Sequence, residues 1–162
     1  MNELNPYAKY LHGEQLEAVL STTAGKLETL IAGMGTVKTA TPPGPGKWSP
    51  AEIVCHLADC ELAFGFRLRQ AAAEEKHVIQ PFDQEKWAVA YPGILAADAL
   101  AAFAALRKWN LAFIVRMMPE AAEREVTHPE RGTMTFATIV ETMAGHDVNH
   151  LVQMMRLAEP VA

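Results

Sequence analysis

The positions of helix breakers constrain the fold of this chain more than any other feature. The stretch TPPGPGK at 41–47 cannot continue a helix or a central strand, because its prolines lack the backbone N–H group and its glycines are flexible. Directly after it, Ser49-Pro50-Ala51-Glu52 has the pattern of a capping box with proline at the first helical position. A helix is therefore predicted from Pro50 to about Glu75.

Three further segments show apolar residues at helical spacing. The first follows an Asn5-Pro6 cap and is expected to end at Gly33 and Gly35. This helix is expected to span about 6–34. Another is expected at about 95–118, ended by Pro119. The last helix is expected to start at Thr135 or Thr138 and to end before Pro160.

Strand signals are nearly absent, so the four segments predict an all-α fold, a four-helix bundle formed by a single domain over 1–162. The connection at 76–93 is much longer than adjacent antiparallel helices need. We expect it to cross the whole bundle and to make the helices at 50–75 and 95–118 parallel.

Composition excludes several classes of function. Half of the residues are hydrophobic, a fifth are charged and the net charge is −5, which is typical of a soluble globular protein and gives nucleic-acid binding no electrostatic support. No apolar run approaches the ~20 residues of a membrane span. The N-terminus lacks the apolar region of a signal peptide, so a cytoplasmic protein is expected, with Cys55 and Cys60 reduced.

The motif HDVNH at 146–150 places two histidines one helical turn apart. At 100° per residue, His146 and His150 lie within about 20° of Ile139, in the middle of the apolar stripe that must face the core. Buried imidazoles need partners for their ring nitrogens, and a shared metal ion satisfies both. The alternative is two unrelated histidines that share a buried surface.

A third histidine is found on the helix predicted at 50–75. His56 lies on the flank of its core stripe, so one histidine from this helix and two from the last predict a three-histidine site. Three protein ligands leave an open position for water, which is typical of catalytic zinc. Cys60 follows His56 by four residues and is either a fourth ligand or, as we prefer, a small buried residue.

Two charged residues share the flank of His56. Asp59 is a candidate hydrogen-bond partner for a ligand imidazole or a general base, and otherwise an exposed helix acid. Arg67 is a candidate anchor for a carboxylate of a substrate or thiol cofactor. Alternatively, Arg67 pairs with Glu61 or Glu141 and ties helices together.

Other side chains carry weaker expectations. Asp147 points away from the histidine stripe, which predicts a surface or helix-packing residue. Gln153 and His12 are candidate cavity residues. A second apolar face on the 50–75 helix predicts a dimer contact or packing under the 76–93 connection; its members are Cys55, Leu62 and Phe66.

Four motifs together resemble the DinB-like superfamily, particularly its YfiT-type branch of metal-dependent hydrolases. They are KWSPAEIVCHLAD at 47–59, Arg67, HPERGTMTFATIVE at 128–141 and HDVNH at 146–150. The resemblance implies a four-helix bundle with a long crossover, often a homodimer, that binds zinc or nickel through His56, His146 and His150. It also implies thiol-dependent relatives, which include S-transferases that use bacillithiol or mycothiol and a maleylpyruvate isomerase.

The sequence thus favours a divalent-metal-dependent enzyme, either a hydrolase or a thiol S-transferase, that acts on an electrophilic small molecule. A low-molecular-weight thiol is the expected second reactant in the transferase case. The competing hypothesis is a non-catalytic metal-binding or dimerisation bundle.

Overall fold

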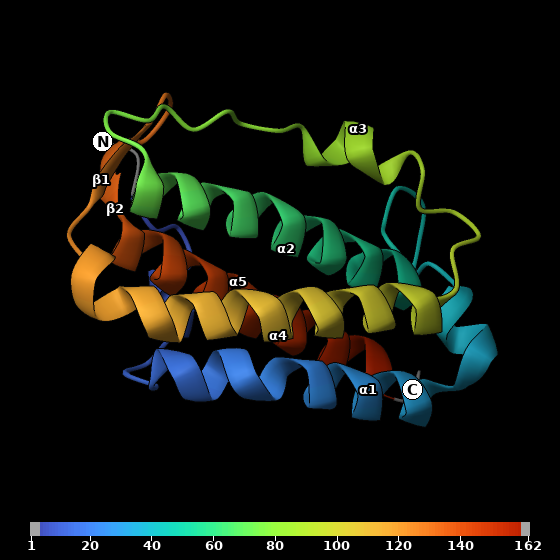
Figure 1. Cartoon of the computed structure of the whole chain (residues 1–162). Helices are drawn as coiled ribbons and strands as arrows, with labels where there is room; N and C mark the ends of the chain where they lie inside the picture. The colour runs from blue at the N-terminus through green and yellow to red at the C-terminus, as the bar shows by residue number, and fades with distance from the viewer. Residues whose placement is uncertain (1–3, 160–162) are drawn as a thin grey trace.

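A computed structural model describes residues 4–159 of the chain (Figure 1). Its four long helices are α1 (Leu16–Ala40), α2 (Pro50–Ala73), α4 (Ala96–Ala121) and α5 (Phe136–Ala158). The short elements are the 3₁₀ helix η1 (Ala8–Tyr10), α3 (Gln84–Ala88), β1 (Glu125–His128) and β2 (Gly132–Thr135). Across 4–159, every helix falls short of the length and apolar character needed to cross a membrane.

The long connection between α2 and α4 runs back along the bundle. Figure 1 shows it passing above α2, with α3 near its far end, before the chain enters α4. As a result α2 and α4 run in the same direction, and α1 and α5 run in the opposite one. The predicted four-helix bundle with a long crossover is confirmed. Pairs of like direction pack most closely, α2 against α4 and α1 against α5.

The capping box at the start of α2 is confirmed in detail. The Ser49 hydroxyl accepts a hydrogen bond from the Glu52 amide at 3.2 Å, and the Glu52 carboxylate accepts one from the Ser49 amide at 2.7 Å. These bonds satisfy amides that a helix start leaves without partners. They fix where α2 begins, and hence the position of His56 two turns later.

The predicted start of the first helix was wrong. Asn5 accepts a hydrogen bond from the Tyr7 amide at 3.0 Å, but the turn that follows ends after η1. His12 and Gly13 have φ angles of 45° and 81°, which a right-handed helix cannot include. The long helix α1 therefore begins only at Leu16.

Two predicted helix ends were also wrong. Gly35 does not stop α1: its φ of 72° and ψ of 167° kink the helix, which continues to Ala40. Pro119 lies inside α4, which ends at Ala121. Proline has no N–H group and therefore cannot donate a helical hydrogen bond itself. The residues after it can still complete the last turn of the helix. Breakers locate helix ends only to within a turn or two.

A β-hairpin between α4 and α5 was missed. Its strands pair antiparallel, with Val126 opposite Met134, and Thr127 also exchanges hydrogen bonds with the crossover, donating to His77 at 3.0 Å and accepting from Ile79 at 2.8 Å. Each strand has four residues, too few for a clear alternating pattern. The hairpin attaches the start of the crossover to the end of the bundle where α5 begins.

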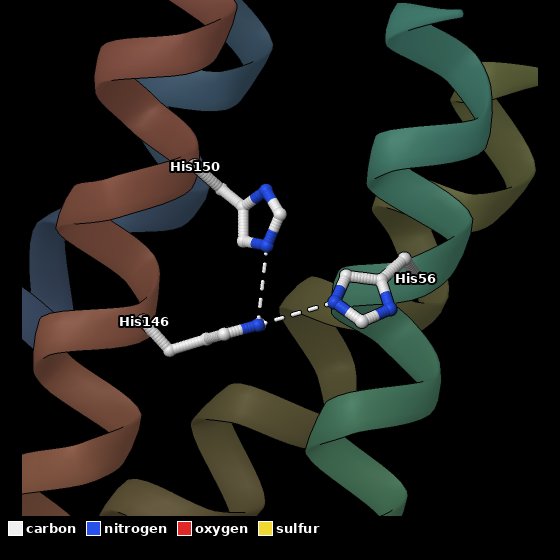
Figure 2. Close-up of side chains that lie close together, drawn as sticks. All are labelled: His56, His146 and His150. Atoms are coloured by element: carbon white, nitrogen blue, oxygen red, sulfur yellow. Dashed lines mark hydrogen bonds between the residues drawn. The ribbon is translucent and has the colours of Figure 1, made fainter. Parts of the chain in front are cut away.

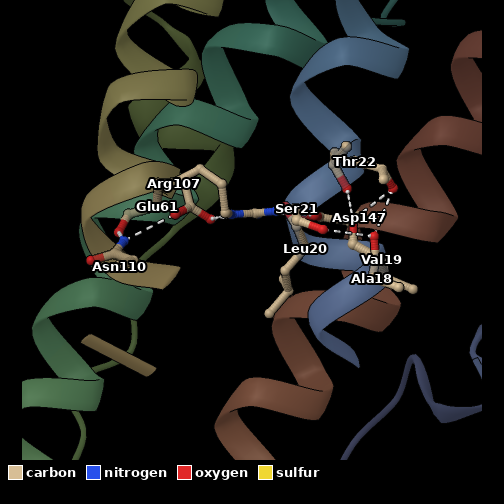
Figure 3. Close-up of polar contacts among 10 residues, drawn as sticks. Ala18, Val19, Leu20, Ser21, Thr22, Glu61, Arg107, Asn110 and Asp147 are labelled. Atoms are coloured by element: carbon tan, nitrogen blue, oxygen red, sulfur yellow. Dashed lines mark hydrogen bonds and ion pairs between the residues drawn. The ribbon is translucent and has the colours of Figure 1, made fainter. Parts of the chain in front are cut away.

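A buried ionic network joins the helices that carry the histidines (Figure 3). Arg107 of α4 donates to the Glu61 carboxylate of α2 at 2.6 and 3.0 Å, to the Asp147 carboxylate of α5, and to the Leu20 carbonyl of α1 at 3.0 Å. Asn110 donates to Glu61 at 2.9 Å. Asp147 is thus a buried helix-packing residue, as one of the two sequence alternatives stated.

Candidate metal centre

Three histidines converge between α2 and α5 (Figure 2). The Nε2 atom of His146 lies 3.1 Å from that of His56 and 3.1 Å from that of His150. One ligand atom from each ring lies within 4.8 Å of the others, and the residues are only 1%, 5% and 8% exposed for His56, His146 and His150, respectively. The predicted three-histidine cluster therefore exists as a buried group of facing ring nitrogens.

Burial keeps all three imidazoles neutral. Burial, with a further contribution from His150, lowers the pKa of His56 to about 3. Burial lowers the pKa of His146 and that of His150 as well, and the neighbouring histidines and Arg107 add to the effect at His146. The neutral ring is the form that binds a metal, because its unprotonated nitrogen carries the lone pair.

The hydrogen bonding of His150 directs its lone pair to the centre of the cluster. Its Nδ1 atom lies 2.9 Å from the Gln153 side-chain oxygen, which accepts a hydrogen bond from the Nδ1–H group. Nε2 then lacks a proton and faces His146. Gln153 therefore acts on the site from outside it, as an orienting partner of the kind that metal-bound histidines have.

The spacing of the nitrogens fits a metal ion. Tetrahedral zinc with Zn–N bonds of 2.0–2.1 Å separates its nitrogen ligands by about 3.3 Å. The two Nε2–Nε2 separations of 3.1 Å are close to this value. Without an ion, a facing pair shares a hydrogen bond when one of its two nitrogens carries the proton. The donor set present therefore suits a divalent cation that accepts imidazole.

Cys60 lies beside the cluster but outside it. Its Sγ atom is 3.5 Å from His56 Nε2, yet among residues 4–159 the group of mutually close ligand atoms consists of the three histidines. Burial raises the pKa of the Cys60 thiol. Cys55 and Cys60 are both free and buried. This arrangement favours the interpretation of Cys60 as a small buried residue over that of a fourth ligand.

Aromatic rings enclose the histidines. Tyr7 packs edge-on against His146 at 5.1 Å between ring centroids, and Trp48 packs against His56 at 4.9 Å. Tyr7 approaches closely because residue 145 is glycine: a Cβ there would lie 2.6 Å from the Tyr7 carbonyl oxygen. Sequence reasoning missed Tyr7, because the prediction placed it in a regular first helix.

A cavity of about 210 Å³ opens beside His56 and His146. Its wall comes from α2, the crossover, the hairpin, α5 and the N-terminal segment. Besides the two histidines it is lined by Tyr7, Cys60, Phe64, Arg67, Ile79, Pro81, Phe82, Gln84, His128, Glu130, Arg131, Met134, Ile139 and Thr142. His128 and Arg131 carry no helical spacing signal and were missed, since only the hairpin brings them here.

Arg67 faces this cavity, whereas Asp59 does not line it. Arg67 donates a hydrogen bond to the Gln80 carbonyl at 3.2 Å. Within 4–159 it forms no ion pair with Glu61 or Glu141, so the alternative role of Arg67, an ion pair that joins two helices, is not observed. The Asp59 carboxylate accepts from the Tyr91 hydroxyl at 2.7 Å. The expected hydrogen bond from a ligand imidazole to Asp59 is not among those of the described residues.

His12 lies outside the site. It is exposed, in the turn before α1, and does not line the cavity. The helix break at His12 and Gly13 turns this side chain to solvent, whereas the continuous first helix of the prediction would have directed it inward. Of the two weaker cavity candidates, only Gln153 contacts a histidine of the cluster.

Comparison with known proteins identifies the family. The model of the DinB superfamily matches residues 20–154, which include all three histidines. The chain belongs to the DinB superfamily. This DinB protein is 26% identical to a "putative metal-dependent hydrolase" of Oceanobacillus iheyensis over 98% of both chains. A protein of Bacillus mycoides with the same description is 28% identical over 74% of this chain and 69% of its own.

A solved structure shares the fold. YfiT from Bacillus subtilis, described as "a probable metal-dependent hydrolase with an unusual four-helix bundle topology", superposes with a TM-score of 0.81. The match covers 88% of this DinB protein and 83% of YfiT, at 22% sequence identity. At this identity the similarity establishes the bundle topology, including the parallel α2 and α4.

Proposed function

We propose that this DinB protein is a divalent-metal-dependent enzyme that acts on an electrophilic small molecule, as a hydrolase or a thiol S-transferase. The observation that carries the proposal is the convergence of three buried, neutral imidazoles beside a cavity. His56, His146 and His150 would hold zinc or nickel, both of which accept imidazole ligands. When bound, such an ion supplies Lewis acidity that activates a water molecule or a low-molecular-weight thiol as the nucleophile.

The cavity favours an enzyme over a structural metal site. Structural zinc usually has four protein ligands and no access for a reactant. Here three histidines form the group, and the cavity reaches two of them. A non-catalytic metal-binding bundle would instead require a closed site, for which Cys60 is the available fourth ligand.

In the proposed enzyme, the residues around the histidines have different roles. The rings of Tyr7, Trp48 and Phe64 pack on the imidazoles and keep water from surrounding them. Arg67 in the cavity wall orients the substrate. Asp59 positions rather than reacts, because its carboxylate holds Tyr91, whose ring lies 6.1 Å from that of Trp48.

Metal content tests the proposal first. Tag-free protein purified without chelator should contain near-stoichiometric zinc or nickel by mass spectrometry, and His150→Ala should lose it. His12→Ala is the matched control, because His12 is exposed and lies outside the cavity. If the wild type remains free of metal after incubation with zinc and nickel, the proposal fails. If the wild type does bind the metal, the metal-loaded protein should hydrolyse electrophilic substrates or transfer a thiol to them. The His150→Ala variant should leave the same substrates unchanged.

We also propose a homodimer that uses the outer face of α2. Leu62 and Phe66 are 53% and 63% exposed there, while Cys55, the third member of the predicted face, is buried in the core. Light scattering after size exclusion should give twice the chain mass, and Phe66→Asp should give the chain mass. A monomeric wild type would exclude this contact. The cytoplasmic location stays a prediction.

A further inference from the structure

Two arginines line the cavity beside the histidine cluster. Arg67 belongs to α2, and Arg131 lies in the turn between β1 and β2. The histidine cluster uses neither of them. Neither forms an ion pair with a carboxylate within 4–159. Their shared position in one wall raises the question of which ligand they serve.

The hydrogen bonding of Arg67 is incomplete. A guanidinium has five N–H donors. Arg107, the buried arginine of the ionic network, directs its donors to two carboxylates and a carbonyl. Within 4–159, Arg67 makes one hydrogen bond, to the Gln80 carbonyl. Its guanidinium lies 5.5 Å from the Phe82 ring centroid and 6.0 Å from that of Phe64. Both rings lie within cation–π range of the guanidinium, which has N–H donors beyond the one that Gln80 accepts.

Arg131 and His128 extend the same surface. Arg67 and Arg131 line the same cavity. Burial lowers the pKa of Arg67, Cys60 opposes this, and the charge of Arg131 lowers it further. His128 accepts a hydrogen bond from the Glu130 amide at its Nδ1 atom, so its Nε2 atom carries the proton and is a further donor. Burial and the two arginines lower the pKa of His128 and keep it neutral.

The wall is therefore positive and rich in donors. Glu130 contributes one negative charge against the two arginines, which leaves an excess of one positive charge before any metal binds. A guanidinium fork matches the two oxygens of a carboxylate. The rest of the lining is mainly apolar and includes Phe64, Ile79, Phe82, Met134 and Ile139.

We propose that Arg67 and Arg131 bind a carboxylate of the substrate, so that the enzyme acts on small monocarboxylates with an apolar body. This rests on the proposed function, since the reaction itself takes place at the three histidines. The arginines fix one end of the molecule, and the apolar wall contacts its body beside His56 and His146. Arg67 and Arg131 thereby set specificity for charge.

Benzoate and benzamide are the probes, because they have similar shape and differ in charge. Binding to metal-free and to zinc-loaded protein is measured by calorimetry or chemical-shift titration at constant pH. We expect benzoate to bind metal-free wild type about tenfold more tightly than benzamide, as charge-assisted hydrogen bonds allow. Arg67→Gln and Arg131→Gln should each remove most of this preference. Arg124→Gln, an equal charge change at an exposed site outside the cavity, should retain it.

The outcomes separate this inference from the proposed function. Equal binding of the two probes to metal-free wild type overturns the inference, even if the protein holds metal. A preference that appears only with zinc and survives both arginine substitutions also overturns it, because benzoate then binds the ion. If the metal-free protein prefers benzoate to benzamide but never takes up zinc or nickel, the arginine site is supported and the proposal of a metal-dependent enzyme is overturned. If Arg67→Gln does not fold, Arg131→Gln in the hairpin turn decides.

Discussion

Removing Arg107 should destabilise this protein severely, because two buried carboxylates depend on it. Burial opposes the charge of Arg107, but Asp147 and Glu61 outweigh burial and raise its pKa. All three side chains are at most 4% exposed, so water cannot replace the arginine. Arg107→Met keeps much of the side-chain volume and removes every hydrogen bond that the guanidinium donates.

The expected loss follows from these contacts. Breaking a buried ion pair by removing one partner costs about 3–5 kcal/mol of unfolding free energy. For a chain of this size, each kcal/mol lowers the melting temperature by about 2–4 °C, so the shift should be about 6–20 °C. Urea unfolding and calorimetry of metal-free protein measure both quantities without a contribution from metal binding.

Two variants make the test of Arg107 specific. Arg116→Met, on the exposed face of the same helix, should change stability by no more than about 0.5 kcal/mol. Arg107→Met combined with Glu61→Leu and Asp147→Leu should recover much of the loss, because no buried charge is then left without a partner. If Arg107→Met alone loses less than about 1 kcal/mol, the reasoning about the buried network is refuted.

Three further predictions concern the histidine cluster. Cys60→Ser should retain bound metal by mass spectrometry, and loss of the metal would identify Cys60 as a ligand. Gly145→Ala should lose about 1–3 kcal/mol in urea unfolding, because its Cβ would collide with the Tyr7 backbone, whereas Gly25→Ala, with open space around it, should not destabilise the helix. In metal-free protein the folded-state pKa of His56 is about 3, below its ordinary 6.5, so the unfolded state binds more protons between these values. Stability should be fully present above pH 6.5 and fall as pH drops toward 3, by up to about 1.4 kcal/mol per unit from this histidine, and a flat profile would contradict its neutral burial.

Local sequence chemistry determined the helices and most of the histidine cluster. The Ser49 capping box set the start of α2, and the period of 3.6 residues put His146 and His150 on one core-facing stripe. Both effects act within a few residues, so they can be read without knowing what packs against the helix. The same reasoning failed at Gly35, because packing along α1 tolerates a kink where local preference favours an end.

Only the tertiary structure decided what surrounds those histidines. The sequence offered Glu61 as a partner for Arg67, but α4 brings Arg107 to Glu61 and Asp147, and Arg67 is left facing the cavity. Arg131 reaches the same cavity because a hairpin of two four-residue strands, each too short to show a pattern, folds beside the crossover. Periodicity fixes which side of a helix a residue occupies. The partner it meets there depends on contacts between segments far apart in the chain, which only the folded structure determines.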